Sequence, residues 1–103
     1  MFRVVIVTTE NEEEAKTIAR KIVEEKLAAC ANIVPKISST YWWKGKIENS
    51  EEALMLIKTT ETKVNALVAR VKELHSYDNP EIISLSIEKG SQEYLDWIGD
   101  STS

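Results

Sequence analysis

Residues 41–48 read Tyr-Trp-Trp-Lys-Gly-Lys-Ile-Glu, and this stretch decides the fold because it holds a tight turn between two strand-like segments. Lys44-Gly45 is a two-residue loop of the kind that joins antiparallel strands. The flanking segments, 29–43 and 46–59, are rich in β-branched and aromatic residues. We therefore predict a long β-hairpin in the middle of the chain.

The two hairpin strands change character along their length. Pro35 has no N–H to give to a sheet, so we expect a bend, a bulge or a sheet edge at that point of the first strand. In the second strand, residues 48–52 are polar and should protrude. The Ala-Leu-Met-Leu-Ile run at 53–57 is typical of a strand that is buried on both faces.

Upstream of the hairpin, the sequence predicts a strand followed by a helix. Residues 2–9 are mostly apolar and β-branched, as in a central buried strand. Asn11 is expected to cap the helix, with Glu14 completing a capping box and the helix ending near Lys26. The apolar residues at helical spacing, which predict a face packed on the sheet, are Ala15, Ile18, Ala19, Ile22 and Val23.

Downstream of the hairpin, the pattern predicts a helix, a strand and a short final helix. Residues 62–75 carry one apolar stripe, and Pro80 follows the end of that helix. Residues 81–87 alternate apolar and polar side chains, which indicates a strand with one apolar face. Gly90 should end this strand, and Ser91 should cap the last helix.

The predicted order of elements is β-α-β-β-α-β-α. The first six elements match the split βαβ, or ferredoxin-like, arrangement, in which two helices cover one face of an antiparallel sheet. We therefore predict an α+β ferredoxin-like sandwich with a long hairpin between its second and third strands and an extra C-terminal helix. At 103 residues, the whole chain 1–103 is expected to form a single domain.

Composition limits the classes of function. The formal net charge is −4, which argues against nucleic-acid binding because such surfaces need clustered Lys and Arg. No apolar stretch approaches the length that spans a membrane, so we expect no membrane partner. The single cysteine, Cys30, indicates a reducing, cytoplasmic location.

The end of the hairpin carries three aromatic residues, Tyr41, Trp42 and Trp43. An aromatic ring buries about 150–250 Å² when it is covered, so a monomer gains little from two adjacent tryptophans at a hairpin end. One alternative is that one ring packs on its own sheet while the other is simply exposed. We favour a hairpin that reaches into a neighbouring subunit, and we predict an oligomer interface at these three residues.

The segment 75–82 holds the only histidine, His75. Its plainest role is that of a cation at a helix C-terminus, where it would interact with exposed carbonyl groups. The other interpretation is a ligand for a metal or small anion, with Tyr77 and Glu81 nearby. One histidine cannot build a selective transition-metal site, so further ligands are needed: Cys30 if the fold brings it close, or residues of other subunits.

Residue patterns for catalysis are absent from the sequence. Cys30 lies among small apolar residues, which favours a buried thiol acting as a small hydrophobe over a nucleophile. The chain has no CxxC pair, no Gly-x-Ser-x-Gly elbow and no glycine-rich phosphate loop. We therefore expect a protein that is not an enzyme and has no catalytic residues.

Several motifs together resemble the divalent-cation tolerance (CutA) family over nearly the whole chain. In order they are Leu27 to Ile33, the hairpin at 41–48, Ile57-Lys58-Thr59, Leu74 to Tyr77 with Pro80 to Ile82, and Tyr94 to Trp97. Motifs that recur in the right order make the resemblance specific.

The resemblance implies a ferredoxin-like subunit in a tight homotrimer, with long hairpins completing sheets between subunits. It also implies a cytoplasmic role in tolerance of divalent metal ions, copper above all, with copper or another divalent cation as the ion bound. The chain departs from the family at Ser76, where a proline is usual. The cysteine and second histidine that bind copper in some members correspond here to Thr8 and Leu74.

We therefore predict a non-enzymatic trimer that binds a metal ion or small ligand in clefts between subunits. His75 and Glu81 would bind the metal, Tyr77 would donate a hydrogen bond to the ligand, and Cys30 and Lys58 would also line the ligand site. The alternative is a trimeric signal protein like the nitrogen-regulatory PII proteins, binding a nucleotide or another small effector. The lack of a phosphate loop counts against this alternative.

Overall fold

The structure, a computed structural model, describes residues 1–103. Its elements follow the predicted order, and the predicted 62–75 helix begins as a short 3-10 turn, η1. The elements are β1 (Phe2–Thr9), α1 (Glu12–Glu24), β2 (Cys30–Trp43), β3 (Lys46–Thr60), η1 (Glu61–Lys63), α2 (Val64–Leu74), β4 (Ile82–Ile87) and α3 (Gln92–Ser101).

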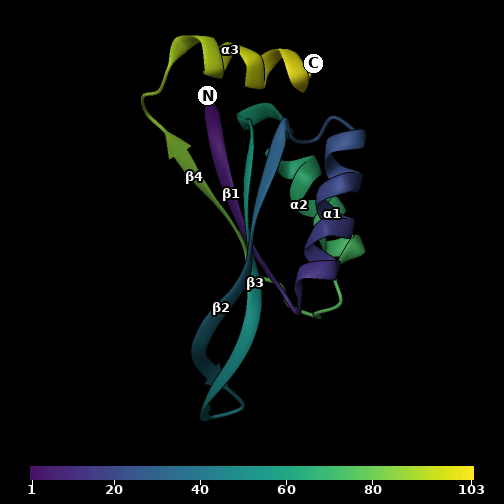
Figure 1. The fold of residues 1–103 in the computed structure, drawn as a ribbon, viewed down its shortest axis with the longest axis vertical. Coiled ribbons are helices and arrows are strands. Elements are labelled where there is room, and N and C mark those ends of the chain that lie inside the picture. Colours follow the sequence, from purple (N-terminus) through teal and green to yellow (C-terminus); the bar gives the residue numbers. More distant parts are fainter.

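The strands form one antiparallel sheet in the order β2-β3-β1-β4. Helices α1 and α2 cover one face of this sheet, while α3 crosses one end of it (Figure 1). The predicted α+β ferredoxin-like sandwich with an extra C-terminal helix is therefore confirmed. None of its helices is long and apolar enough to traverse a lipid bilayer.

The core lies between the sheet and the two covering helices. Alternate residues of the central strands face these helices, because side chains of a strand point to opposite sides in turn. The fully buried members with the largest side chains are Val5, Val7, Ile18, Ile22, Met55, Ile57, Leu67 and Val71. The apolar stripes predicted for both helices are thus the surfaces that pack on the sheet.

The two predicted helix caps behave differently. Asn11 Oδ1 accepts a hydrogen bond from Glu14 N–H at 2.9 Å, as expected of a helix N-cap. The Glu14 carboxylate, however, accepts from Glu10 N–H at 3.0 Å, one residue earlier than a capping box requires. Ser91 occupies the N-cap position of α3, but its side chain makes no capping hydrogen bond.

The hairpin turn has the predicted geometry, with Lys44 at φ 50° and Gly45 at φ 78°. Both angles are positive, as in the two-residue turns that match the twist of paired strands. Pro35 lies in a shift of register between Val34 and Ile37, so the bulge expected there is present.

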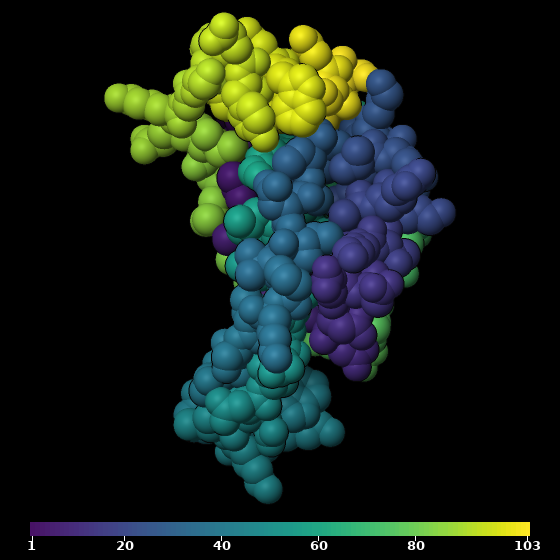
Figure 2. Space-filling model, viewed as in Figure 1, coloured from purple at the N-terminus to yellow at the C-terminus, as the bar shows by residue number.

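Residues 37–52, here called the hairpin arm, pair only with each other, because β1 reaches no further along β3 than Ala53. The arm projects away from the helices and gives the molecule its longest dimension of 44 Å (Figures 1 and 2).

The face of the sheet opposite α1 and α2 is apolar and is here called the open face. Its apolar members, by alternation from the core positions, are Phe2, Val4, Ile6, Val34, Leu54, Leu56, Ile83, Leu85 and Ile87. In β4 the predicted apolar side faces away from the helices, leaving Ile83 48% and Leu85 51% exposed. Ser84 pairs with the core residue Val5 and thus faces inward, where its hydroxyl has no hydrogen-bond partner.

Candidate functional site

His75 lies just after α2, and its side chain is completely buried. Tyr77 N–H donates to Nδ1 at 3.1 Å, so the ring proton lies on Nε2, which donates to the carbonyl oxygen of Thr8 at 2.8 Å. The histidine therefore ties the loop after α2 to the end of β1. Interaction of His75 with the α2 carbonyl groups, the plainest role expected from the sequence, is replaced by these two bonds.

Glu14 holds the same loop from the other side. Its Oε2 accepts a hydrogen bond from Ser76 N–H at 2.7 Å and lies 3.7 Å from His75 Nδ1. Burial raises the pKa of Glu14, but the hydrogen bonds from the backbone of Glu10 and Ser76 outweigh it, so the net pKa lies below the ordinary value. The carboxylate is thus the favoured form of Glu14 in the folded chain.

Tyr77 extends this group of residues to the hairpin. Its hydroxyl donates to Glu52 Oε2 at 2.8 Å, and its ring lies 4.8 Å from that of His75. Burial raises the pKa of Tyr77 strongly, and the Glu52 carboxylate raises it further, so the phenol keeps its proton at neutral pH. Glu14, Glu52, His75 and Tyr77 are here called the His75 cluster.

Glu81 does not join the His75 cluster. Its side chain is exposed, and no hydrogen bond or ion pair connects it to His75. Within one chain, no three His, Cys, Asp or Glu side chains lie close enough together to hold a metal ion. Both ring nitrogens of His75 are also engaged. If His75 and Glu81 bind a metal, further ligands must come from another subunit. The hydrogen bond from Tyr77 N–H to His75 Nδ1 must also break, so that this nitrogen can face the metal.

Cys30 and Lys58 meet in a second group at the start of β2. Lys58 Nζ donates to Asn32 Oδ1 and lies 3.8 Å from Cys30 Sγ, while the hydroxyl of Tyr94 lies 4.0 Å from the same sulfur. Burial raises the pKa of Tyr94, and the nearby thiol adds to this effect, so Tyr94 is a neutral donor. Cys30, Asn32, Lys58 and Tyr94 are here called the Lys58 cluster.

Cys30 differs from its sequence-based interpretation. The small apolar neighbours predicted a buried thiol, whereas the residue is half-exposed. The reason is its register: Cys30 pairs with Lys58, and this pair points to the open face instead of the core.

Both clusters border the open face. Glu52 and Lys58 alternate with the core residues Ala53 and Ile57, so they share the face of Leu54 and Leu56. Glu52 lies where the hairpin arm leaves the sheet, and Lys58 lies toward α3. The predicted ligand residues Tyr77, Cys30 and Lys58 are therefore all at the margins of one uncovered apolar surface.

Four partners in these clusters were missed by the sequence analysis: Glu14, Glu52, Asn32 and Tyr94. Asn32 was within reach, because it is two residues after Cys30 in a strand and so shares its face. The contact of Tyr94 with Cys30 spans 64 residues, and that of Tyr77 with Glu52 spans 25. No local sequence pattern predicts contacts between residues so far apart in the chain.

The aromatic residues of the hairpin are exposed in the single chain. Trp42 is 73% and Trp43 56% exposed, and Tyr41 contacts only the hydroxyl of Ser50, at 3.2 Å, among hydrogen-bonding groups. Neither tryptophan packs deeply on its own sheet, which was the alternative to an interface. The oligomer interface at Tyr41, Trp42 and Trp43 stays a prediction that this exposure favours.

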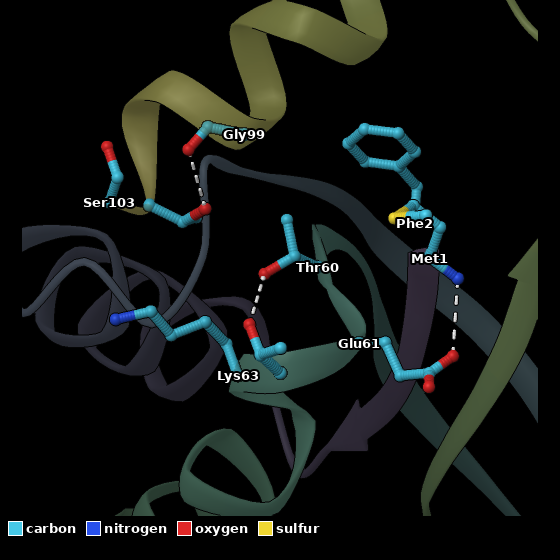
Figure 3. Close-up of a pocket in the computed structure, with 9 residues that line it drawn as sticks. Met1, Phe2, Thr60, Glu61, Lys63, Gly99 and Ser103 are labelled. Atoms are coloured by element: carbon cyan, nitrogen blue, oxygen red, sulfur yellow. Dashed lines mark hydrogen bonds and ion pairs between the residues drawn. The ribbon is translucent and has the colours of Figure 1, made fainter.

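A shallow pocket of about 540 Å³ lies beneath the end of α3. Figure 3 shows Met1, Phe2, Thr60 and Glu61 on one side of it and Gly99 and Ser103 on the other, with the N-terminal amine bonded to Glu61. None of the residues predicted to bind a metal or ligand lines this pocket. Its polar groups bond mainly to one another, so it is a weaker candidate than the two clusters.

Known proteins give consistent matches along the whole chain. A family model described as CutA1 divalent ion tolerance protein matches residues 3–101. The divalent-cation tolerance protein CutA of Thermus thermophilus is 49% identical over 102 residues, covering 99% of both chains. The chloroplastic protein CutA 1 of Oryza sativa is 50% identical over 99 residues, which are 96% of this chain and 56% of the rice protein.

Solved structures agree with the sequence matches. The structure of the periplasmic divalent cation tolerance protein CutA from Archaeoglobus fulgidus superposes with a TM-score of 0.97 at 42% identity, covering 100% of both chains. The structure of CutA1 from Oryza sativa superposes with a TM-score of 0.96 at 49% identity, covering 99% of this chain and 94% of the other.

Proposed function

The chain belongs to the CutA1 divalent ion tolerance protein family, and on that basis we propose that it acts as a homotrimer in tolerance of divalent metal ions, copper foremost. The trimer binds a metal ion or small ligand in the clefts between its subunits. Its role is non-enzymatic, and no catalytic residue is assigned to it.

The open face and the hairpin arm support an oligomer. Half-exposed Ile83 and Leu85 belong to a continuous apolar surface of the kind that marks subunit interfaces. The exposed Trp42 and Trp43 at the end of the arm give a second apolar contact, distant from the first. In the proposed trimer, neighbouring copies cover both the open face and the end of the arm.

The position of both clusters at the edge of the open face is the observation that carries the cleft proposal. When another subunit packs on this face, Tyr77 with Glu52 and Cys30 with Lys58 come to lie between subunits. A cleft between subunits is a common place for a small-ligand site. His75 then acts mainly by fixing the loop that carries Tyr77.

A bound divalent cation needs donors from more than one chain in this proposal. His75 and Glu81 are the predicted ligands, and imidazole and carboxylate are both suitable donors to divalent metals. The ring of His75 offers Nδ1 only when Tyr77 N–H releases it. Copper is the ion to test first because imidazole sites bind Cu²⁺ more tightly than other divalent first-row metals.

The proposed compartment is the cytoplasm, where a free thiol such as Cys30 persists in the reduced form. The relative from Archaeoglobus fulgidus is described as periplasmic. Fractionation of the native cells, with detection of the protein in each fraction, tests this assignment directly.

Multi-angle light scattering at micromolar concentration tests the trimer. We expect a mass three times that of one chain, and a mass equal to one chain would contradict the proposal.

Copper titration by calorimetry tests the metal role in wild type, His75→Ala and Glu81→Gln. We expect weaker binding in both variants, with the exposed Glu88→Gln as a control. Unchanged affinity in His75→Ala would remove His75 from the site.

A further inference from the structure

Lys58 is a cation beside the apolar side chains of the open face, and no carboxylate of its own chain pairs with it. It lies opposite Cys30 in β2 and Val4 in β1, and it takes part in none of the ion pairs of the chain. A half-buried ammonium among apolar neighbours is costly unless an opposite charge compensates it. The subunit alone supplies only neutral partners to Lys58.

The other members of the Lys58 cluster also present hydrogen-bond donors. Lys58 Nζ donates to Asn32 Oδ1, which leaves the NH₂ group of Asn32 and further ammonium protons free to donate. The Tyr94 hydroxyl has only a long contact, 4.0 Å, to Cys30 Sγ. An ammonium, an amide NH₂ and a neutral phenol gathered at one point match the acceptor oxygens of a carboxylate or phosphate.

Helix α3 adds an aromatic wall to the same place, made of two rings tilted by 37° to each other. The rings of Tyr94 and Trp97 lie 5.4 Å apart, and both are half-exposed. Exposed aromatic faces next to a cation suit a ligand with an anionic group and an apolar or planar body.

We infer that the Lys58 cluster binds the oxyanion group, carboxylate or phosphate, of a small ligand. Lys58 balances its charge, Asn32 and Tyr94 donate hydrogen bonds to its oxygens, and the Tyr94–Trp97 wall contacts the rest of the ligand. This inference rests on the proposed function in one respect, because the open face becomes a cleft only when subunits assemble.

Calorimetric titration of the full chain with inorganic phosphate, and separately with acetate, at constant ionic strength tests the inference. Wild type should bind at least one of the two anions saturably, with one site per chain. Lys58→Met should weaken binding about tenfold or more, the scale of one charge-assisted hydrogen bond. Lys58→Arg should retain binding, and the exposed Lys72→Met is the matched control for loss of a positive charge.

Several outcomes overturn the inference. The inference is wrong if wild type binds neither anion saturably. It is also wrong if Lys58→Met binds the anion as tightly as wild type does. If Lys58→Met does not fold, Asn32→Leu takes its place, and unchanged binding in that variant also counts against the site. If Lys58 instead pairs with a carboxylate of a neighbouring subunit, wild type binds no anion and the Lys58→Met substitution weakens the trimer.

The same samples separate this inference from the proposed function. A wild-type trimer that binds no anion overturns only the oxyanion site. A wild-type monomer that binds phosphate through Lys58 overturns only the trimeric assembly.

Discussion

Glu14 serves two elements at once. Its carboxylate accepts from the backbone of Glu10 ahead of α1 and from the backbone of Ser76 after α2. Two helices far apart in the sequence are thereby fixed to one side chain, next to the buried ring of His75. The charge on Glu14 is therefore a stabilising feature of the folded chain.

Removing that charge should change how stability depends on pH. Because the pKa of Glu14 is lowered on folding, its ionised form stabilises the protein fully above the ordinary value of 4.5, and this contribution is lost as the pH falls through the lowered pKa. Urea unfolding should show Glu14→Gln about 1–3 kcal/mol less stable than wild type at neutral pH. The difference should shrink in acid, well below pH 4.5.

Glu13→Gln is the matched control, because Glu13 is exposed in the same turn of α1. Its stability should follow that of wild type. An equal deficit of Glu14→Gln at neutral and acidic pH would contradict a role for the charge.

Single residues were easier to select from the sequence than their partners. His75, Tyr77 and Lys58 stand out as the only histidine or as parts of motifs, but each acts through a group far along the chain. His75 bonds to Thr8, 67 residues away, and this contact depends on how α2 meets the end of β1. Side-chain contacts of that kind follow from the packed fold and have no local signature.

At the scale of elements, β4 is the strand that fits its own subunit least well. Its core-facing residue Ser84 is polar and has no hydrogen-bond partner, while Ile83 and Leu85 are exposed. A buried hydroxyl without a partner destabilises the fold by its desolvation cost. The exposed Ile83 and Leu85 of β4 become buried only when another molecule covers them.

Ser84→Ala should therefore stabilise the protein. We expect the free energy of unfolding to rise by about 1 kcal/mol, since the variant removes an unsatisfied hydroxyl while keeping a small side chain. Ser86→Ala, at an exposed position two residues on, should leave stability within about 0.5 kcal/mol. Urea denaturation of the three proteins measures both effects. A loss of stability in Ser84→Ala would mean that the hydroxyl has a bonding partner after all.

The elements themselves were largely predictable because their signals are local. The Lys44-Gly45 turn, the Pro35 bulge and the Asn11 cap each follow from the chemistry of one or two residues. The orientation of β4 was not predictable in the same way. Alternation in a strand defines two faces, but only the tertiary arrangement decides which of them the helices cover.

For the whole molecule, the open face and the hairpin arm point outward from a core that is complete by itself. Helices α1 and α2 already bury the inner side of the sheet, so the outer apolar side is surplus to the folding of one chain. In the proposed trimer this surplus becomes the contact between subunits. Assembly then contributes the burial that β4 lacks.

A charge on the open face should weaken the trimer. Leu85→Glu places a carboxylate in the proposed contact, where its desolvation opposes association. We expect the concentration at which the trimer dissociates to rise at least about tenfold, on the several kcal/mol scale of burying a charge. Light scattering over a dilution series measures this.

Ala69→Glu adds the same charge on the exposed side of α2 and should leave the assembly unchanged. Equal dissociation of wild type and Leu85→Glu would show that the subunits meet elsewhere.

The central place of β1 also affects the synthesis of the protein. This strand precedes both of its neighbours in the chain, since β3 begins at Lys46 and β4 ends at Ile87. The hairpin can close soon after residue 60 emerges from the ribosome, because its contacts are local. One edge of β1 remains unpaired until β4 has been translated. Between the synthesis of β1 and that of β4, the nascent protein therefore carries an apolar strand with a free edge, and aggregation or chaperone binding is most expected in that period.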